Sequence, residues 1–191
     1  KCAFSIASVP SDPLLHLHIK PTLDSEDSTI IETMLNDPPR LLSVEYPLGD
    51  CFLDHCPDRA VILIAASTGI TQMRSMLGYL KEQDFAKDIF LYWGVLEEED
   101  LYLHSELLTL AEQWQHFHYI PVVSDMTRSP SWQGKAGLVG NVVLADIDDL
   151  NTRSIYVSGS PVMVYATLDS FVAKGFNEKN VHSDVFSFAP R

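Results

Sequence analysis

The chain has 191 residues and a formal net charge of −13, with a sequence pI near 4.7, which is enough chain for one large domain or two small ones. Its 13 basic residues stand against 26 acidic ones and form no visible basic patch, which argues against a nucleic acid or an anionic membrane as partner. The sequence has no apolar run long enough to cross a bilayer, and its three cysteines favour reduced thiols in a cytoplasmic location over a disulfide scaffold.

The first part of the chain is typical of short strands joined by turns. Ala3–Ser8 and Leu14–Lys20 are predicted strands, separated by a turn that contains two prolines. Asp27–Asn36 carries apolar side chains on one helical side and is followed by Asp-Pro-Pro, which predicts a short helix. Leu41–Tyr46 is a third predicted strand. We therefore expect a β-rich domain over residues 1–56.

Strands and helices alternate over residues 57–191, the second predicted domain. The predicted strands are Ala60–Ala65, Asp88–Tyr92, His118–Val123 and Ser154–Val157. The predicted helices are Thr71–Gln83, Leu101–Gln115, Leu138–Ala145 and Pro161–Ala173. This alternation predicts a parallel sheet covered by helices on both faces, whose ligands bind outside the carboxyl ends of the strands.

The segment from Ala60 to Thr71 is the most informative of these units. A continuous apolar run gives way to small residues and Gly69, and helical spacing begins at Thr71. Such a strand–turn–helix unit presents backbone N–H groups and the positive end of a helix to a phosphate. An ordinary strand-to-helix connection explains the pattern equally well, because Ala and Ser stand where a glycine-rich loop would be more specific.

Seven short motifs span nearly the whole chain. They are Phe4-Ser-Ile-Ala-Ser8, Leu17-His-Ile19, Ala65-Ala-Ser-Thr-Gly-Ile70, Tyr92-Trp-Gly94, Trp132-Gln-Gly-Lys-Ala-Gly-Leu-Val139, Tyr156-Val-Ser-Gly-Ser-Pro-Val-Met163 and Asp184-Val-Phe-Ser-Phe188. Each motif is weak by itself. In this order and spacing, the chain resembles the ferredoxin–NADP reductase superfamily, and within it the small bacterial NAD(P)H–flavin reductases.

That resemblance implies an α/β fold with a β portion. A partial antiparallel flavin-binding barrel is followed by a Rossmann-like parallel-sheet module for the nicotinamide dinucleotide. In the family, hydride passes from nicotinamide C4 to flavin N5 where the two modules meet. Family members have further barrel strands before the motif at Phe4, so we expect the barrel in this chain to be incomplete, with exposed strand edges.

The same resemblance implies which residues border the flavin. The matching positions are Phe4, Ser5, Ile6, His18, Ile19, Lys20, Gly49 and Phe186. The backbone of residues 18–20 is expected along the edge of the isoalloxazine ring, and Gly49 in a turn beside it. Phe186 or Phe188 either covers the flavin or is a core aromatic, and both interpretations stay open.

The resemblance also implies the residues that bind NAD(P)H. The matching positions are Ser67, Thr68, Gly69, Ile70, Tyr92, Gly94, Ser124, Gly159, Pro161 and Met163. Three hydroxyl side chains are predicted to be catalytic: Ser5 near flavin N5, Thr68 in the gap between the two rings, and Ser158 facing the transferring hydride. No His–Asp pair is placed to make Ser158 a nucleophile, so we expect it to position the ring.

Two departures from the family pattern concern the choice of cofactor. Cys2 stands where the family has an arginine for the flavin phosphate, so FMN, FAD or riboflavin is expected to bind weakly, as an exchangeable substrate. The acidic run Glu97–Asp100 follows Gly94 where NADPH-dependent members carry basic residues, which favours NADH. The run is equally well explained as a solvated helix start, and Arg128 is the residue that would reverse this preference.

Two clusters suggest metal ligands, and we predict no metal site at either. His16 and His18 lie on one face of a predicted strand, but no further ligands accompany them. Cys51, His55 and Cys56 form a spacing that more often reflects packing and a loop in a reducing compartment.

The sequence thus predicts an NAD(P)H:flavin oxidoreductase that supplies reduced flavin or electrons to an acceptor. Its partners would be flavin and nicotinamide nucleotides, with an electron-acceptor protein as a further possibility. Two alternatives stay open: a reductase component that keeps its flavin and serves an oxygenase or an electron-transfer chain, and a nucleotide-binding module without turnover.

Overall fold

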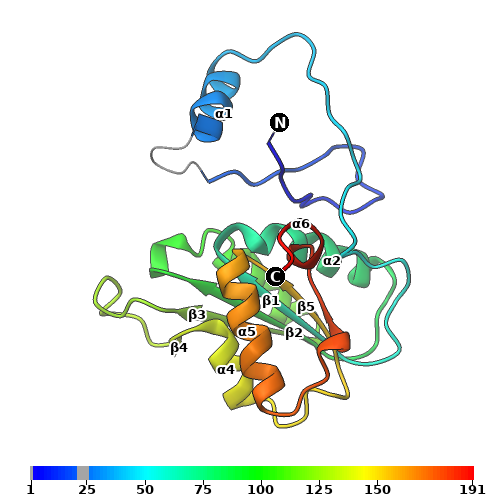
Figure 1. Cartoon of the computed structure of the whole chain (residues 1–191), viewed down its shortest axis with the longest axis vertical. Helices are drawn as coiled ribbons and strands as arrows, with labels where there is room; N and C mark the ends of the chain where they lie inside the picture. The colour runs from blue at the N-terminus through cyan, green and yellow to red at the C-terminus, as the bar shows by residue number, and fades with distance from the viewer. Residues whose placement is uncertain (1, 21–25) are drawn as a thin grey trace.

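A single parallel sheet forms the centre of the computed structural model, which describes residues 2–20 and 26–191 (Figure 1). In this part of the chain, six strands lie in the order β4-β3-β2-β1-β5-β6, and every neighbouring pair is parallel. The strands are β1 (Val61–Ala66), β2 (Ile89–Val95), β3 (Phe117–Val123), β4 (Lys135–Ala136), β5 (Ser154–Ser158) and β6 (Val181–His182). The predicted parallel sheet is confirmed.

Helices cover both faces of this sheet. The helices α2 (Ile70–Glu82) and α3 (His104–Gln113) pack on one face. The helices α4 (Val139–Asp146) and α5 (Pro161–Ala173) pack on the other. Residues 61–65 of β1 are fully buried because this central strand is covered on both sides, so its sequence is a continuous apolar run rather than an alternation.

The shortest helices and strands of the structure cannot be predicted from the periodicity of the sequence. The edge strands β4 and β6 are two residues long, and the 3₁₀ turns η1 (Ser67–Gly69), η2 (Glu98–Asp100) and η3 (Glu178–Asn180) are three. The helix α6 (Val185–Phe188) has four residues. Two to four residues are too few for a period of 2 or 3.6 to emerge, so none of these elements was predicted.

The N-terminal part of the chain differs from the expected barrel. Its described residues contain the helix α1 (Glu26–Asn36), near the predicted position, and one antiparallel bridge between Ile6 and Leu17. The three predicted strands are therefore wrong as strands, because an extended segment becomes a strand only when its backbone groups pair along a neighbour. No flavin-binding barrel is seen among residues 2–20 and 26–56, and the domain boundary at residue 56 stays a prediction.

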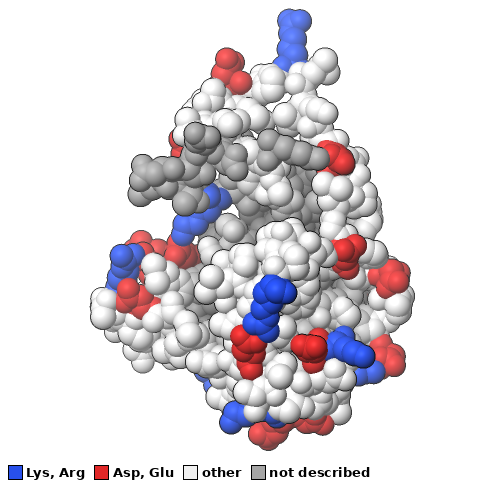
Figure 2. Space-filling model, in the orientation of Figure 1, with Lys and Arg blue, Asp and Glu red and all other residues white. Residues whose placement is uncertain are grey.

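The surface carries charges of both signs. On the face shown in Figure 2, acidic and basic side chains are scattered over the surface, several of them next to one another. Within the described residues, no helix is both long and apolar enough to cross a membrane.

Candidate functional site

The strand order reverses between β1 and β5, and the loops that follow these two strands meet there. The chain runs from β1 outward through β2, β3 and β4, and then returns to β5 on the other side of β1. A Cβ atom on Gly69 would lie 2.3 Å from the carbonyl oxygen of Ser158, so only glycine allows this contact. Such a reversal is the usual ligand site of open α/β sheets, and it brings the predicted Thr68–Gly69 and Ser158–Gly159 segments together.

The loop after β1 is held in an unusual conformation by a tryptophan. Ser67 has a φ of +50°, a value rare for a residue with a side chain. The indole Nε1 of Trp93 donates a hydrogen bond of 2.9 Å to the carbonyl of Ser67, and Trp93 itself is fully buried in β2. Trp93 therefore fixes the backbone just before Thr68 and Gly69.

Two helix N-termini follow the meeting loops. Neither α2 nor α5 has an acidic residue in its first turn, so no carboxylate competes there for an anion. At α5, Ser160 caps the helix by accepting a hydrogen bond of 3.3 Å from the Met163 N–H, and Pro161 takes the first helical position. The chemistry of this edge fits the diphosphate of a dinucleotide.

Other residues predicted to contact the nucleotide make packing or backbone contacts within the module. A Cβ on Gly94 would lie 2.8 Å from Cβ of Val139, so this glycine permits close packing of β2 against α4. The hydroxyl of Ser124 donates to the carbonyl of Val95 at 3.0 Å. Tyr92 is 1% exposed, with its ring in the core on the α4 side. A direct contact between the nucleotide and the Tyr92 ring stays a prediction. The same holds for Ile70, whose side chain is also buried.

Arg128 is paired with acidic groups. Its Nη1 lies 2.9 Å from a carboxylate oxygen of Glu97, and its Nε lies 3.6 Å from Asp125. Asp125 also accepts hydrogen bonds from Thr127, chiefly from its hydroxyl, and these keep the pKa of this carboxyl below its usual value. Two carboxylates therefore offset the charge of Arg128, the residue predicted to decide between NADH and NADPH.

Two of the segments predicted to border the flavin are neighbours. The bridge between Ile6 and Leu17 and a 2.8 Å hydrogen bond from the Ala7 N–H to the His16 carbonyl join them. Phe4 is 38% exposed and Ser5 is exposed, so both side chains are open to a ligand.

The second of these segments reaches the region after β2. His18 Nδ1 lies 2.7 Å from the hydroxyl of Tyr102, and Lys20 forms an ion pair with Asp100. Burial, together with the nearby Arg74 guanidinium, lowers the pKa of His18 below its usual value. The imidazole is therefore neutral at pH 7.

Gly49 lies elsewhere, against Asp184 in the C-terminal segment that also carries Phe186. Gly49 has a φ of +91°, and a Cβ there would lie 2.6 Å from a carboxylate oxygen of Asp184. Phe186 is half-buried, with its ring centroid 5.7 Å from that of Tyr165 on α5. The contact with Tyr165 supports the interpretation of Phe186 as a core aromatic. Phe188, in contrast, is 67% exposed.

The cysteine–histidine cluster does not assemble into a ligand set. Burial raises the pKa of the Cys51 thiol to about 12, so this side chain stays protonated inside the core. His55 instead pairs with Asp54. Among the described residues, no group of three or more His, Cys, Asp or Glu side chains is arranged to hold a metal.

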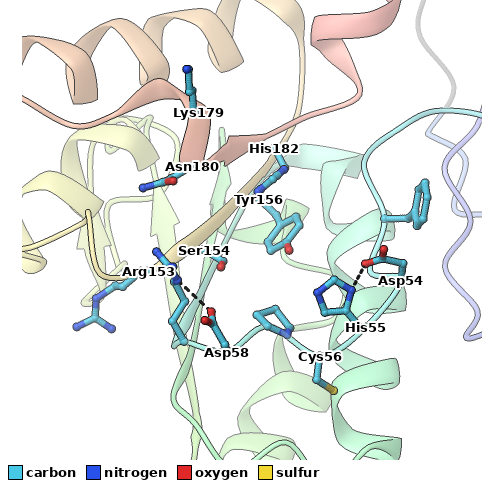
Figure 3. Close-up of a pocket in the computed structure, with 13 residues that line it drawn as sticks. Asp54, His55, Cys56, Asp58, Arg153, Ser154, Tyr156, Lys179, Asn180 and His182 are labelled. Atoms are coloured by element: carbon cyan, nitrogen blue, oxygen red, sulfur yellow. Dashed lines mark hydrogen bonds and ion pairs between the residues drawn. The ribbon is translucent and has the colours of Figure 1, made fainter.

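His55 and Cys56 belong to the lining of a hollow of about 570 Å³, and its lining residues are drawn in Figure 3. This hollow lies at the amino ends of β1 and β5, where Ser154 and the stacked rings of Tyr156 and His182 line it. It is therefore at the opposite edge of the sheet from the loops that carry the predicted nucleotide contacts.

Sequence reasoning missed several residues that organise the site. Trp93 packs edge-on against Tyr102, with ring centroids 5.3 Å apart, and Tyr102 packs in turn against His18 at 5.5 Å. The loop predicted to bind the nucleotide is thus connected through two aromatic rings to a segment predicted to border the flavin. The motif Tyr92-Trp-Gly94 singled out Trp93. The sequence could not predict that its indole would donate a hydrogen bond to the carbonyl of Ser67.

This geometry defines a class of protein: a dinucleotide-binding α/β module of the ferredoxin reductase type. The family described as the oxidoreductase NAD-binding domain matches residues 63–169. The chain is 31% identical over 194 residues to an NAD(P)H-flavin reductase of Aliivibrio fischeri, which covers 98% of this chain and 81% of that protein. It is 32% identical over 189 residues to Protein RfbI of Salmonella typhimurium, which covers 97% of this chain and 54% of that protein.

The fold likeness extends to a solved reductase. The structure of the Amycolatopsis cytochrome P450 reductase GcoB matches with a TM-score of 0.79 at 23% identity, over 95% of this chain and 55% of that one. The chain thus spans about half the length of RfbI and of GcoB. The chain belongs to the oxidoreductase NAD-binding domain family of ferredoxin reductase-like enzymes, and the resemblance seen in its motifs is confirmed.

Proposed function

We propose that this chain acts as an NAD(P)H:flavin oxidoreductase. The observation that supports this most is the meeting of the β1 and β5 loops at the reversal of strand order, where Gly69 touches Ser158. When bound, the nicotinamide supplies a hydride from C4 and the flavin accepts it at N5. The residues of the chain would bind the two rings, orient them and keep water out.

The nucleotide side would use backbone groups more than side chains. The N–H groups at the starts of α2 and α5 would bind the diphosphate. Ser67, Gly69, Gly159, Pro161 and Met163 shape the loops around it.

On the same side, Gly94 and Ser124 lie at the carboxyl ends of β2 and β3, where they would face the adenosine half. The hydroxyl of Thr68 would lie between the rings, and Ser158 would position the nicotinamide.

The flavin side would rest on Phe4, Ser5 and the backbone from Ile6 and from residues 18–20. The exposed hydroxyl of Ser5 is free to donate a hydrogen bond to N5 as charge develops there. Gly49 and Phe186 would border the ring from the C-terminal side. Because Cys2 replaces the family's arginine, we propose that FMN, FAD or riboflavin exchanges freely.

NADH is the proposed coenzyme. Arg128 is already paired with Glu97 and Asp125, so a 2′-phosphate would have to displace these carboxylates in order to bind Arg128. Replacing Glu97 with Gln should lower the ratio of kcat/KM for NADH over NADPH several-fold, to an extent about equal to one surface ion pair. An unchanged ratio would mean that Arg128 does not lie at the 2′ position.

Reduced flavin or electrons would pass to an acceptor, in the cytoplasm as the reduced cysteines suggest. The alternative is a reductase component that keeps its flavin and serves a protein partner.

One assay separates the alternatives: NADH oxidation by the desalted chain with no flavin, with riboflavin and with FMN. Dependence on added flavin is the expected result. Full activity without it would favour a flavin-retaining reductase component. Absence of turnover under all conditions would contradict the proposed function and leave a nucleotide-binding module.

The role of Ser5 is tested by Ser5→Ala in anaerobic single-turnover reduction. We expect a slower hydride transfer, by up to about 10²-fold, with nearly unchanged flavin affinity. An unchanged rate would assign Ser5 to structure alone.

A further inference from the structure

Two side chains far apart in the sequence, Gln72 and Asp184, meet at one turn of the N-terminal part. The Oδ1 atom of Asp184 accepts hydrogen bonds from the N–H groups of Asp50 at 3.0 Å and Cys51 at 2.8 Å. The Nε2 atom of Gln72 donates to Asp184 Oδ2 at 2.8 Å and to the Cys51 carbonyl at 2.7 Å. These bonds join the turn, the first part of α2 and the segment before α6.

Glycine is required at the first position of this turn. The φ of Gly49 is +91°, and a Cβ would lie 2.6 Å from Oδ1 of Asp184, so a side chain would push the carboxylate away. The hydroxyl of Ser187 adds a bond of 2.7 Å to the carboxylate of Asp50. The backbone of the turn is thus fitted to the carboxylate of Asp184.

Apolar packing anchors this turn only at its last residue, Cys51, which is buried in the core. All residues from 37 to 50 are exposed, so this stretch buries no side chain of its own. Gln72, in contrast, is 9% exposed, and a buried amide is costly unless its donors find acceptors. The turn supplies one acceptor and Asp184 supplies the other, so the buried polar contacts hold this place together.

The helix that contains Gln72 directly follows the loop proposed to bind the dinucleotide. The turn η1 ends at Gly69, and α2 starts at Ile70, two residues before Gln72. A rigid helix start therefore lies between the loop proposed to bind the dinucleotide and the turn proposed to border the flavin. A shift of about 1 Å between two reacting rings is enough to slow a transfer strongly.

We propose that Gln72 and Asp184 are positioning residues that hold the Gly49–Cys51 turn at a fixed place relative to the β1 loop, and thereby set the flavin against the nicotinamide. This inference rests on the proposed function, because it assigns the turn to the flavin side. Neither residue needs to touch a cofactor.

The test uses Gln72→Glu, Asp184→Asn and the double variant. Gln72→Glu would place a second carboxylate against Asp184 and the Cys51 carbonyl, which is unfavourable at a buried place. In the double variant, the amide introduced by Asp184→Asn can donate to the new carboxylate at position 72, while its oxygen still accepts from the Asp50 and Cys51 N–H groups. Asp169→Asn, at an exposed carboxylate of α5 that pairs with Arg191, is the matched control.

For Gln72→Glu we expect the KM for added flavin to rise about tenfold, the KM for NADH to stay within about twofold, and amide exchange at Asp50 and Cys51 to accelerate. The double variant should recover a large part of both losses, and Asp169→Asn should behave like the parent chain. Recovery in the double variant would show that positions 72 and 184 interact directly, because general destabilisation of the fold would not be reversed by a second substitution.

The possible outcomes separate this inference from the proposed function. No NADH oxidation by the parent chain would contradict the proposed function itself. An active parent whose variants lose protection at Cys51 but keep the parent KM for flavin would overturn the positioning role. Parallel losses in both KM values, without recovery in the double variant, would also overturn it and indicate damage to the whole fold.

Discussion

The α/β module and the N-terminal part of this chain are held together by different forces. Residues 61–65 of β1 are 0% exposed, whereas Leu41, in the N-terminal part, is 91% exposed. The module buries its apolar side chains in two clusters, one on each face of the sheet. The N-terminal part leaves most of its apolar side chains in solvent and has one antiparallel bridge between its described segments.

Polar contacts with α2 take the place of a core in the N-terminal part. The hydroxyl of Ser75 donates to the carbonyl of Ser8 at 2.7 Å, and Ser11 donates to Glu82 further along the same helix. A hydrogen bond contributes about 1 kcal/mol in net terms, much less than a buried leucine side chain. The helix α2 is therefore a scaffold for both parts of the chain, and the two parts can be perturbed separately.

The largest expected effect is in the centre of the sheet. Leu63→Ala removes a fully buried side chain and should lower the free energy of unfolding by about 2–5 kcal/mol. Leu41→Ala, the matched control, should change it by less than about 0.5 kcal/mol. Urea unfolding followed by circular dichroism measures both. Similar losses would mean that Leu41 belongs to a core, and the contrast between the two parts would fail.

The next effect concerns the contact between the β1 and β5 loops. A Cβ on Gly69 would meet backbone atoms of Ser158, which cannot move as a side-chain end does. Gly69→Ala should therefore cost about 1–3 kcal/mol of stability, and it should raise the KM for NADH. Thermal unfolding and steady-state kinetics measure the two effects. A variant with parent stability and parent KM would show that the loops do not touch in solution.

Gly78→Ala is the same chemical change at the boundary between the two parts, and it should have a smaller effect. Its Cβ would lie 2.5 Å from the end of the Val9 side chain, which can move away. Alanine favours the helix by up to about 1 kcal/mol, so the module should be equally or slightly more stable. Hydrogen exchange should accelerate at Ala7 and Asp12. Unchanged exchange there would mean that Val9 does not rest on α2.

The smallest expected effect is a pH dependence. The pKa of His18 is lowered, mainly by burial, and that of His182 is lowered by the same cause. Below the unfolded value of about 6.5, the unfolded chain binds more protons than the native chain, so stability falls as the pH falls. The urea midpoint should be lower at pH 5.5 than at pH 7.5.

His18→Asn is the variant that tests this pH dependence. The difference between the midpoints at the two pH values should shrink when His18 is replaced. A difference of the same size in this variant would exclude His18 as a source.

Much of the module was predictable because its signals are local and long. The bounds of α5 match the prediction, and those of β1 and α2 differ from it by one residue at each end. Apolar runs and helical spacing over six or more residues are strong signals. The strands predicted for the N-terminal part failed since apolar alternation shows what a strand needs, but not whether a neighbouring strand is present to pair with it.

The sequence by itself determined the family, the order of strands and helices, and the loops that form the candidate site, because each of these depends on residues close together in the chain. Only the tertiary structure decided that Gly69 rests on Ser158, that Trp93 holds the carbonyl of Ser67, and that Asp184 holds a turn more than a hundred residues earlier. These contacts join segments whose separation in sequence carries no periodic signal. They form only when the packing of α2 and the C-terminal segment on the sheet brings one donor to one acceptor.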